Sequence, residues 1–375
     1  MTAPLAGIRI IEVGHMLAGP YCGLMLADMG AEVIKIETPE GDIARSVSPH
    51  FVGPHNAYFA SLNRSKKSVV IDLASDEGQE QLGRIAEGAH ALVTNLRPSA
   101  IRKLGLTYSA LKRWNERLVC VALTGYGLDG PHADNPAYDY VIQALTGVMA
   151  LTGDPDAPPT KAGYSAVDNS AGLVAALGLL AKIVQGQGGQ VDVAMYDVML
   201  SQLNYLAGAA LNAGETVARQ PESSHPYVVP AQIFATRGGW LTLFITHDRF
   251  WKIFCDEVGH PEWTADPHFA TMAARRAHRA EVVAAVADVL RGTTAAEWVR
   301  RLVPLGVVAA EVCTLNDALQ GDVATARGLV VPLGDGSLAL QAVASPIRFD
   351  GFVPRYGPPP LLNEHADEVL GKVVA

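Results

Sequence analysis

Short apolar runs in the first third of the chain alternate with segments of helical pattern, and this alternation constrains the fold most strongly. The apolar runs are GIRIIEV (7–13), AEVIKIE (31–37), KSVVIDL (67–73), ALVTNL (91–96) and RLVCVAL (117–123). Residues 18–29 and 76–88 have helical patterns, and the second begins at Ser75-Asp76-Glu77. Strands that alternate with helices indicate βαβ units and a parallel sheet covered on both faces. The sequence therefore predicts an α/β protein.

The remainder of the chain has a different pattern. Helical patterns at 138–152 and 168–185 precede a short strand at 190–195, and the polar stretch 214–230 has three prolines. We then expect a hairpin at 232–246, further helices, and a return to short strands after about residue 330. The expected later helices are 247–258, 278–291, 295–303 and 364–372.

These patterns divide the 375 residues into parts of ordinary domain size. We expect a large Rossmann-like domain at 1–200, a linker at 201–225 and a small α+β domain at 226–329. The C-terminal segment 330–375 is expected to return to the large domain.

Charge is distributed unevenly along the chain. The net charge is −9, but residues 1–120 hold 13 basic and 12 acidic side chains, so that the whole acidic excess lies after them. Nucleic-acid-binding proteins usually present a basic face, and we expect no nucleic-acid partner. An anionic ligand fits the first 120 residues better than the rest.

Neither a metal site nor a membrane segment is expected. The four cysteines are far apart, without a CxxC or a Cys/His cluster, so reduced cysteines and a cytoplasmic location are the simplest interpretation. The N-terminus lacks a basic region followed by an apolar one, as a signal peptide would have. The longest apolar stretch, Ala171–Ala181, ends at Lys182; it is too short to span a bilayer and predicts a buried helix.

Two familiar motifs occur without the context that they need. Residues 125–130 fit GxGxxG, but Pro131 and Pro136 follow where a dinucleotide site needs a helix. Ser165 lies in a Gly-x-Ser-x segment whose fifth residue is Val167, whereas a nucleophile elbow has glycine there. We therefore set aside dinucleotide binding and serine hydrolysis.

Asp168 lies between a polar segment and a nearly uncharged helix. One interpretation is structural, because aspartate is a common N-cap and the helix macrodipole favours a carboxylate there. The other is a carboxylate nucleophile, which attacks acyl carbons and divides an acyl transfer into easier steps. Backbone N–H groups at the helix start would stabilise the oxyanion. The residues alone leave both interpretations open.

Segments along nearly the whole chain follow one another in a recognisable order. They are LAGPYCGLMLADMGAEVIKIETPEGDIAR (17–45), NRSKKSVVIDL (63–73), NLRPSAIRKLGL (95–106), TGYGLDGP (124–131), YDYVIQALTGVMALTG (138–153), PPTKAGYSAVDNSAGL (158–173), GQGGQVDVAMYD (186–197) and PPPLLNEHADEVLG (358–371). In this order they resemble the class III CoA-transferases, the CaiB–BaiF family, which includes formyl-CoA transferase.

The resemblance implies an interlocked homodimer with the active site between domains of the two chains. It also implies that Asp168 is the catalytic aspartate, which carries first an acyl anhydride and then a CoA thioester. The substrates would be an acyl-CoA and a carboxylic acid, with no metal and no tightly bound cofactor. Positions that match the family's coenzyme A contacts are Leu17, Thr38, Ile71, Asp72, Leu73, Asn95, Leu96, Arg97, Lys103, Tyr138 and Asp139.

Lysine and arginine are the expected partners of the CoA phosphates. Thr38 stands where other members have arginine, and Lys103 stands where some do. A wider basic cluster in the same region favours a phosphate role over solubility alone; its members are Arg64, Lys66, Lys67, Arg97, Arg102 and Lys103.

Two departures bear on the reaction. The related α-methylacyl-CoA racemases have a proton-carrying histidine where this chain has Tyr138, and tyrosine is a poor proton carrier near neutral pH. The oligoglycine loop of oxalate-specific members is absent from 222–234. We therefore expect a CoA-transferase with an acceptor other than oxalate. A racemase or isomerase, and a CoA-binding accessory protein, are the alternatives.

Overall fold

The computed structural model describes residues 2–371, so residues 372–375 of the expected C-terminal segment lie outside the described part. The chain forms two compact units. The large unit contains residues up to 146, 162–211 and those from 321 onward, and the small unit contains 147–161 and 212–320. Each unit is described below by itself.

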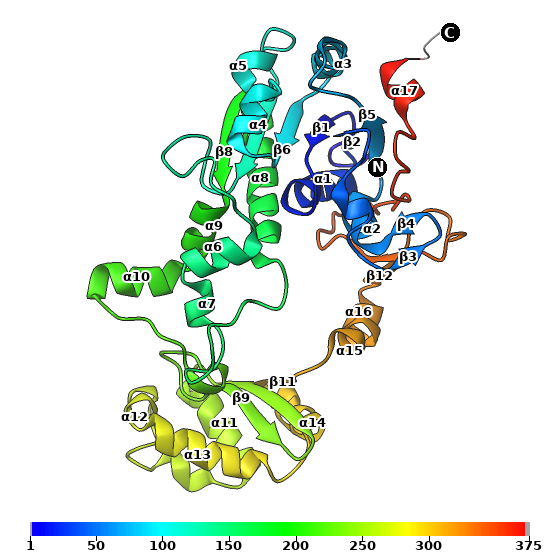
Figure 1. The fold of residues 1–375 in the computed structure, drawn as a ribbon. Helices are drawn as coiled ribbons and strands as arrows, with labels where there is room; N and C mark the ends of the chain where they lie inside the picture. Colours follow the sequence, from blue (N-terminus) through cyan, green and yellow to red (C-terminus); the bar gives the residue numbers. More distant parts are fainter. Residues whose placement is uncertain (1, 372–375) are drawn as a thin grey trace. The chain divides into compact units, whose positions relative to one another are not determined.

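The large unit is built on a six-stranded sheet in the order β5-β2-β1-β6-β7-β8 (Figure 1). All neighbouring strands pair in parallel. The strands are β1 (Arg9–Val13), β2 (Glu32–Glu37), β5 (Lys67–Val70), β6 (Ala91–Thr94), β7 (Val119–Thr124) and β8 (Gly189–Ala194). Their central residues are apolar and buried, as a parallel sheet covered on both faces requires. The expected α/β class and all six predicted strands are confirmed.

Helices cover both faces of this sheet. On one face, α1 (Ala18–Asp28) packs against α8 (Ala166–Gln185). On the other face, the apolar core includes side chains of α3 (Asp76–Glu87) and α4 (Pro98–Lys103) and of the short α5 (Tyr108–Leu111). Ser75 caps α3 by accepting a hydrogen bond from Gly78 N, so the predicted helix start is confirmed.

The predicted helix at 138–152 is two helices, α6 (Asp139–Leu145) and α7 (Val148–Leu151). Gly147 separates them with a φ of 85°, a left-handed conformation that glycine adopts without strain. The predicted linker at 201–225 is wrong in extent, because α9 (Met195–Gln202), α10 (Asn204–Ala213) and a 3-10 helix (Pro221–Ser223) occupy much of it.

Helix α8 is less buried than its sequence suggested. With 20 residues it is the one helix, among residues 2–371, that is long and apolar enough to cross a membrane by length and composition alone. In the structure it packs on α1 and β7, with Leu179 fully buried. Leu177 and Val184, however, are 68% and 86% exposed. The prediction of a buried helix is therefore right for only one face.

The small unit combines the antiparallel sheet β11-β10-β9 with helices. Strands β9 (Ala231–Thr236) and β10 (Gly239–Phe244) form the predicted hairpin. The core is apolar and rich in aromatic rings, including Trp251 and Phe254. The other elements are α11 (Asp248–Val258), α12 (Met272–Ala277), α13 (Arg279–Leu290), α14 (Ala295–Leu302), β11 (Val308–Glu311), α15 (Leu315–Gln320) and 3-10 helices at Pro261–Thr264 and Val303–Leu305.

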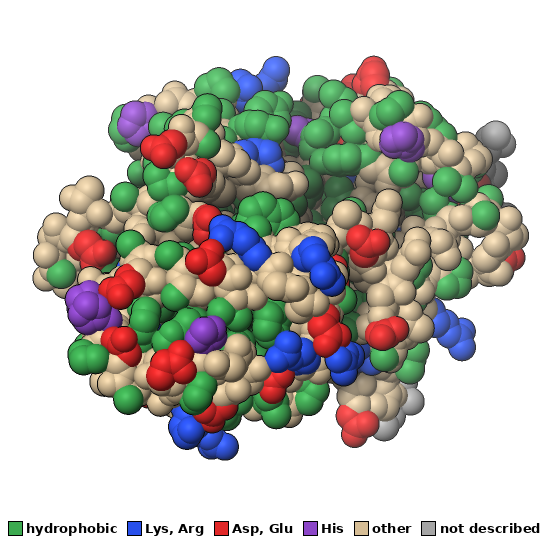
Figure 2. Space-filling view, turned by 90° about the horizontal axis from the view of Figure 1, so that it is seen from below, with side chains coloured by type: hydrophobic (Ala, Val, Ile, Leu, Met, Phe, Trp, Pro, Cys, Tyr) green, Lys and Arg blue, Asp and Glu red, His purple; other side chains and the backbone are tan. Residues whose placement is uncertain are grey.

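The C-terminal segment lies in the large unit. Its elements are α16 (Asp322–Ala326), β12 (Val330–Pro332), β13 (Gln341–Val343) and α17 (Ala366–Leu370). Strand β13 contacts α2 (Ala57–Asn63), and α17 contacts β5 (Figure 1). The remaining elements are a 3-10 helix (Ile43–Arg45), β3 (Phe51–Val52) and β4 (His55–Asn56). On the face shown in Figure 2, basic side chains are interspersed with acidic ones.

Candidate active site

The order of the strands indicates where a ligand binds. Strands β1 and β6 are neighbours, and the chain leaves β1 toward one edge of the sheet and β6 toward the other. Ligands of open parallel sheets bind at such a switch point, beyond the carboxyl ends of the strands. Here the loops after these two strands begin at Gly14 and Asn95.

Asn95 joins the two loops. Its Oδ1 accepts a hydrogen bond from His15 N at 3.0 Å, and its Nδ2 donates to His15 O at 2.9 Å. A Cβ on Gly14 would lie 2.3 Å from the same Oδ1, so the close approach depends on glycine. The expected contact residue Asn95 therefore shapes the backbone of the switch point.

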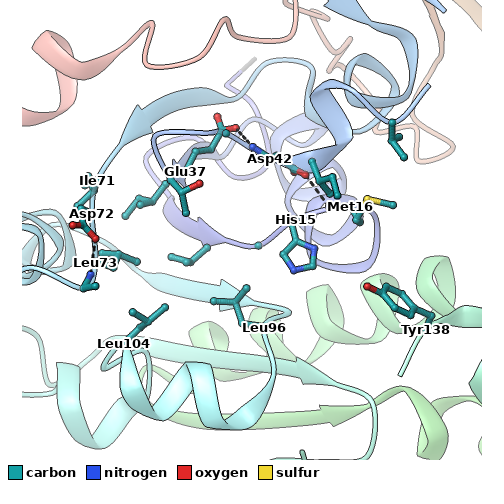
Figure 3. A pocket seen from close by; sticks show the side chains of 18 residues that line it. His15, Met16, Glu37, Asp42, Ile71, Asp72, Leu73, Leu96, Leu104 and Tyr138 are labelled. Carbon is teal, nitrogen blue, oxygen red and sulfur yellow. Dashed lines mark hydrogen bonds between the residues drawn. The ribbon is translucent and has the colours of Figure 1, made fainter. Parts of the chain in front are cut away.

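Two adjoining pockets open beside these loops. The larger is a cavity of about 690 Å³ lined by the ends of β1 and β2 and by residues 71–74 (Figure 3). The smaller, of about 100 Å³, contains Asp168. Four residues line both pockets: His15, Met16, Leu96 and Tyr138. A ligand in the large cavity can therefore extend past these residues to Asp168.

The structure brings most of the predicted site residues to these pockets. Those lining the large cavity are Thr38, Ile71, Asp72, Leu73, Leu96 and Tyr138. Those lining the small pocket are Leu17, Asn95, Leu96, Arg97, Tyr138 and Asp168. Lys103 and Asp139 line neither pocket.

Asp168 is the third residue of α8, and Ser165 occupies the N-cap. The interpretation of Asp168 as the N-cap is therefore wrong, although it remains in the first turn, where the helix dipole favours a carboxylate. Tyr58 lines the same small pocket. Burial, together with the charges of Asp168 and Asp42, raises the pKa of Tyr58, so its hydroxyl keeps its proton as a hydrogen-bond donor.

Asp139 braces the start of α8. Its Oδ1 accepts a hydrogen bond from Val167 N at 2.8 Å, and its Oδ2 accepts one from Gln143 Nε2 at 2.6 Å. Gln143 Oε1 in turn accepts from Ala162 N at 3.0 Å. Asp139 is buried, and these bonds hold the segment that carries Asp168. The i, i+4 spacing of Asp139 and Gln143 was the sequence signal for this pair, and it was missed.

Two of the three carboxylates that line the large cavity, Glu37 and Asp42, are paired with cations; the third, Asp72, accepts a hydrogen bond from Ala74 N. Arg45 Nη2 lies 2.7 Å from Glu37 Oε1, and Lys35 Nζ lies 2.9 Å from Asp42 Oδ2. Burial alone would raise the pKa of both carboxyls, but Arg45 and Lys35 outweigh it and hold both pKa values below their ordinary range. An anionic ligand therefore meets two carboxylates, Glu37 and Asp42, whose charge is already compensated.

The basic cluster expected from the sequence is mostly engaged elsewhere. Arg64 is buried against Asp28 and Lys66 against Glu12, so a phosphate role for these two is wrong. Two more of the six are also paired, Lys67 with Glu32 and Glu368, and Arg102 with Asp134. Of the six, Arg97 and Lys103 have exposed side chains that form no hydrogen bond or ion pair with another residue in the described range 2–371.

His15 was not singled out from the sequence, although it lies only two residues after the end of β1. It lines both pockets, and its buried Nδ1 has no hydrogen-bond partner among the described residues. Burial lowers the pKa of His15, so its imidazole is neutral near pH 7. A neutral ring at this junction can lie against an uncharged part of a ligand.

Comparisons with known proteins agree with this geometry. A family model described as CoA-transferase family III matches residues 5–366. The chain is 33% identical over 392 residues to a protein of Agrobacterium fabrum named succinate–glutarate CoA-transferase, covering 99% of this chain and 96% of that one. It is 32% identical to acetyl-CoA:oxalate CoA-transferase of Acetobacter aceti, covering 93% and 90%. A crystal structure of a CAIB/BAIF family protein from Brucella suis matches with a TM-score of 0.86 at 31% identity, covering 98% and 99%.

Proposed function

Because this chain belongs to CoA-transferase family III, we propose that it moves CoA from an acyl-CoA to a carboxylic acid through covalent intermediates on Asp168. The observation that carries the proposal is the position of Asp168. It lies in the first turn of α8 and lines a pocket that shares four residues with a cavity of about 690 Å³.

The proposed reaction has two symmetrical halves. A carboxylate oxygen of Asp168 attacks the thioester carbonyl carbon, the C–S bond breaks, and CoA leaves as a thiolate. The thiolate then attacks the Asp168 carbonyl of the resulting anhydride, which releases the donor acid and leaves an aspartyl-CoA thioester. An acceptor carboxylate attacks this thioester, and the thiolate it expels attacks the acyl carbon of the second anhydride. Asp168 is thereby restored as a carboxylate.

The start of α8 supports these steps. Each attack creates an oxyanion, and the amides of a helix N-terminus favour negative charge. Asp139 holds this start through Val167 N, so it acts on Asp168 by position rather than by contact with the substrate. Tyr58, whose pKa is raised chiefly by burial, supplies a protonated hydroxyl in the same pocket.

We propose that CoA occupies the large cavity, with Arg97 and Lys103 outside it as the phosphate partners. Both side chains are exposed, and neither forms a hydrogen bond or an ion pair with an acidic residue of the described part. Relatives are named for succinate and glutarate, and for oxalate. A small dicarboxylic acid is therefore the acceptor to test first, with oxalate the weaker one because the oligoglycine loop is absent.

A homodimer and a cytoplasmic location are also proposed. Large apolar side chains of α6, α8 and α10 are exposed in the single chain, and a partner subunit would cover them. They include Tyr140, Leu145, Leu177, Val184 and Leu211. The four free cysteines fit a reducing compartment. Light scattering after gel filtration would measure the mass of the assembly, and a monomer would contradict the first of these proposals.

The test of the reaction compares two aspartates in first helical turns. We expect Asp168→Ala to lower kcat by at least about 10³-fold, as the loss of a covalent nucleophile does, while CoA binds within about threefold of the unmodified protein. Asp76→Ala, in the first turn of α3, should leave both quantities unchanged. Unchanged turnover in Asp168→Ala would refute the role of Asp168 as nucleophile.

A further inference from the structure

The segment Gly14–Pro20 borders both pockets. Gly14, His15 and Met16 line the large cavity, and His15, Met16, Leu17 and Ala18 line the small one. We propose that Lys66, Glu12, Lys35 and Asp42 form a buried charge chain that holds this segment in the shape that binds CoA. The inference rests on the proposed use of the large cavity for CoA, and it assigns positioning residues, of which only Asp42 also lines that cavity.

The four side chains alternate in charge and make direct contacts. Lys66 Nζ lies 2.7 Å from Glu12 Oε2, Glu12 Oε1 lies 2.9 Å from Lys35 Nζ, and Lys35 Nζ lies 2.9 Å from Asp42 Oδ2. All four side chains have an exposed fraction of 0%. The two lysines and two carboxylates have no net charge together, so the group can be buried as a whole.

The buried charge chain contacts the segment at three places. Lys35 Nζ donates to Gly14 O at 2.9 Å, and Lys66 Nζ donates to Pro20 O at 2.8 Å. Between them, Asp42 Oδ1 accepts a hydrogen bond from Met16 N at 3.1 Å. Both ends and the middle of the segment are therefore bonded to the same group of charges.

The hydrogen bond between Asp42 and Met16 holds Met16 in an unfavourable backbone conformation. Met16 has a φ of 62°, in the left-handed region that non-glycine residues rarely adopt. Such a conformation persists only where the surroundings fix it. The hydrogen bonds of Asp42 to Met16 and of Asn95 to His15 fix it here.

Stability alone is a weak reason for this arrangement. Burying charges is costly, and well-packed apolar side chains of similar volume often give equal or greater stability. An ammonium group, however, can direct three donors at fixed acceptors, as Lys66 does toward Glu12, Pro20 and Asn63. Helix α1 lies directly against these charges, because a Cβ on Gly23 would be 2.0 Å from Glu12 Oε2. The charges therefore specify where the backbone lies.

The test compares two buried cations. Lys35→Met removes a cation that lines neither pocket and bonds to Gly14 O. Arg64→Met removes a cation from the buried Arg64–Asp28 pair, which bonds to Val343 O and not to the segment. We expect both variants to lose thermal stability. Only Lys35→Met should raise the CoA Kd and the acyl-CoA KM by about tenfold or more, with kcat changed less than about threefold.

A second variant keeps the proposal testable if Lys35→Met does not fold. The double variant Lys35→Met/Asp42→Asn removes one charge of each sign and leaves Glu12 paired with Lys66. It should fold and still bind CoA at least about tenfold more weakly than Asp42→Asn alone, which controls for the place of Asp42 in the cavity lining.

Either variant binding CoA normally, or Arg64→Met binding it equally weakly, would overturn the inference. Failure of the proposed CoA site gives a different result, because the unmodified protein would then not bind CoA. Failure of the proposed transfer reaction differs again, because CoA binding would remain and no adduct would form on Asp168.

Discussion

The two units bury charge in opposite ways. Beneath its pockets the large unit holds two lysines and two carboxylates with no exposed side-chain surface. The small unit buries the single cation Arg275, which lies over the ring of Trp251 and pairs with Asp248, a side chain 54% exposed. Its core is otherwise apolar and aromatic.

This difference indicates what buried charge does in the molecule. The small unit shows that the chain can stabilise a core with apolar side chains and one charge that reaches the surface. The large unit carries a more costly arrangement where it must hold backbone atoms at fixed positions beside a ligand. We infer that the buried charges beneath the pockets position backbone for function, whereas the buried Arg64–Asp28 pair, which bonds to Val343 O, does not.

The largest effect is expected for Glu12, which pairs with two lysines of the large unit. Its counterpart in the small unit is Asp248, which pairs with Arg275. Glu12→Gln leaves Lys35 and Lys66 buried with one fewer counter-charge, and it should lower the free energy of unfolding by about 3–5 kcal/mol. Asp248→Asn should cost about 1 kcal/mol or less, because Asp248 is half exposed and Arg275 keeps its bonds to Val229 O and Phe269 O. Calorimetry would measure both, and an equal loss would remove the distinction between the units.

The next effect is expected at the brace of α8. Asp139→Ala leaves Val167 N and Gln143 Nε2 without their acceptor, which costs about 1–3 kcal/mol for a buried group. Loss of the brace should also displace Asp168, and we therefore expect kcat to fall by about 10–100-fold. Steady-state kinetics with a saturating acyl-CoA would measure it.

Asn115→Ala is the matched control for this brace. Asn115 also braces backbone atoms, at Ala86 O and Ala89 O, but it lies away from both pockets. The Asn115→Ala variant should be less stable than the unmodified protein and should have the same kcat. Full activity in Asp139→Ala would show that the brace does not position Asp168.

Acid should destabilise the large unit through its buried carboxyls. Although burial opposes the shift, the neighbouring cations lower the pKa of Glu12, Glu37 and Asp42 in the folded protein. The stability they contribute is therefore complete above their ordinary pKa values and is lost as the pH falls through those values toward the lowered ones. The loss on going from about pH 5 to pH 3 should be smaller in Asp42→Asn than in the unmodified protein. An unchanged acid dependence would contradict this role for Asp42.

The smallest effect is expected at the exposed cations. Arg97→Gln and Lys103→Gln should each weaken CoA binding about three- to tenfold at low salt, and less at high salt, because exposed charges are screened. Arg84→Gln, on an exposed face of α3, is the control and should bind CoA normally. Titrations at two salt concentrations would measure the Kd values. Equal binding by all three variants would remove Arg97 and Lys103 from the CoA site.

The sequence predicted what depends on local pattern. Each strand of the parallel sheet is a run of apolar residues, and the Ser75 cap is set by its immediate neighbours, so both could be predicted. Arg64 and Lys66 were misassigned to phosphate binding because their partners, Asp28 and Glu12, lie 36 and 54 residues earlier in the chain. No local pattern distinguishes a basic residue on the surface from one paired in the core.

Asp168 shows the same limit at shorter range. Its type and its place before an apolar helix were visible, but its position inside the first turn depends on Asp139, which fixes Val167 from 28 residues away. The exposed face of α8 was missed because apolar composition does not show whether a surface is covered within the same chain.

The central claim is that Asp168 carries a covalent intermediate. The most direct test is mass spectrometry of the intact protein after incubation with a panel of acyl-CoAs, followed by hydroxylamine trapping and peptide mapping. The account predicts an acyl or CoA adduct and a hydroxamate at Asp168. Turnover of an acyl-CoA and an acceptor acid without any adduct at Asp168 would contradict it.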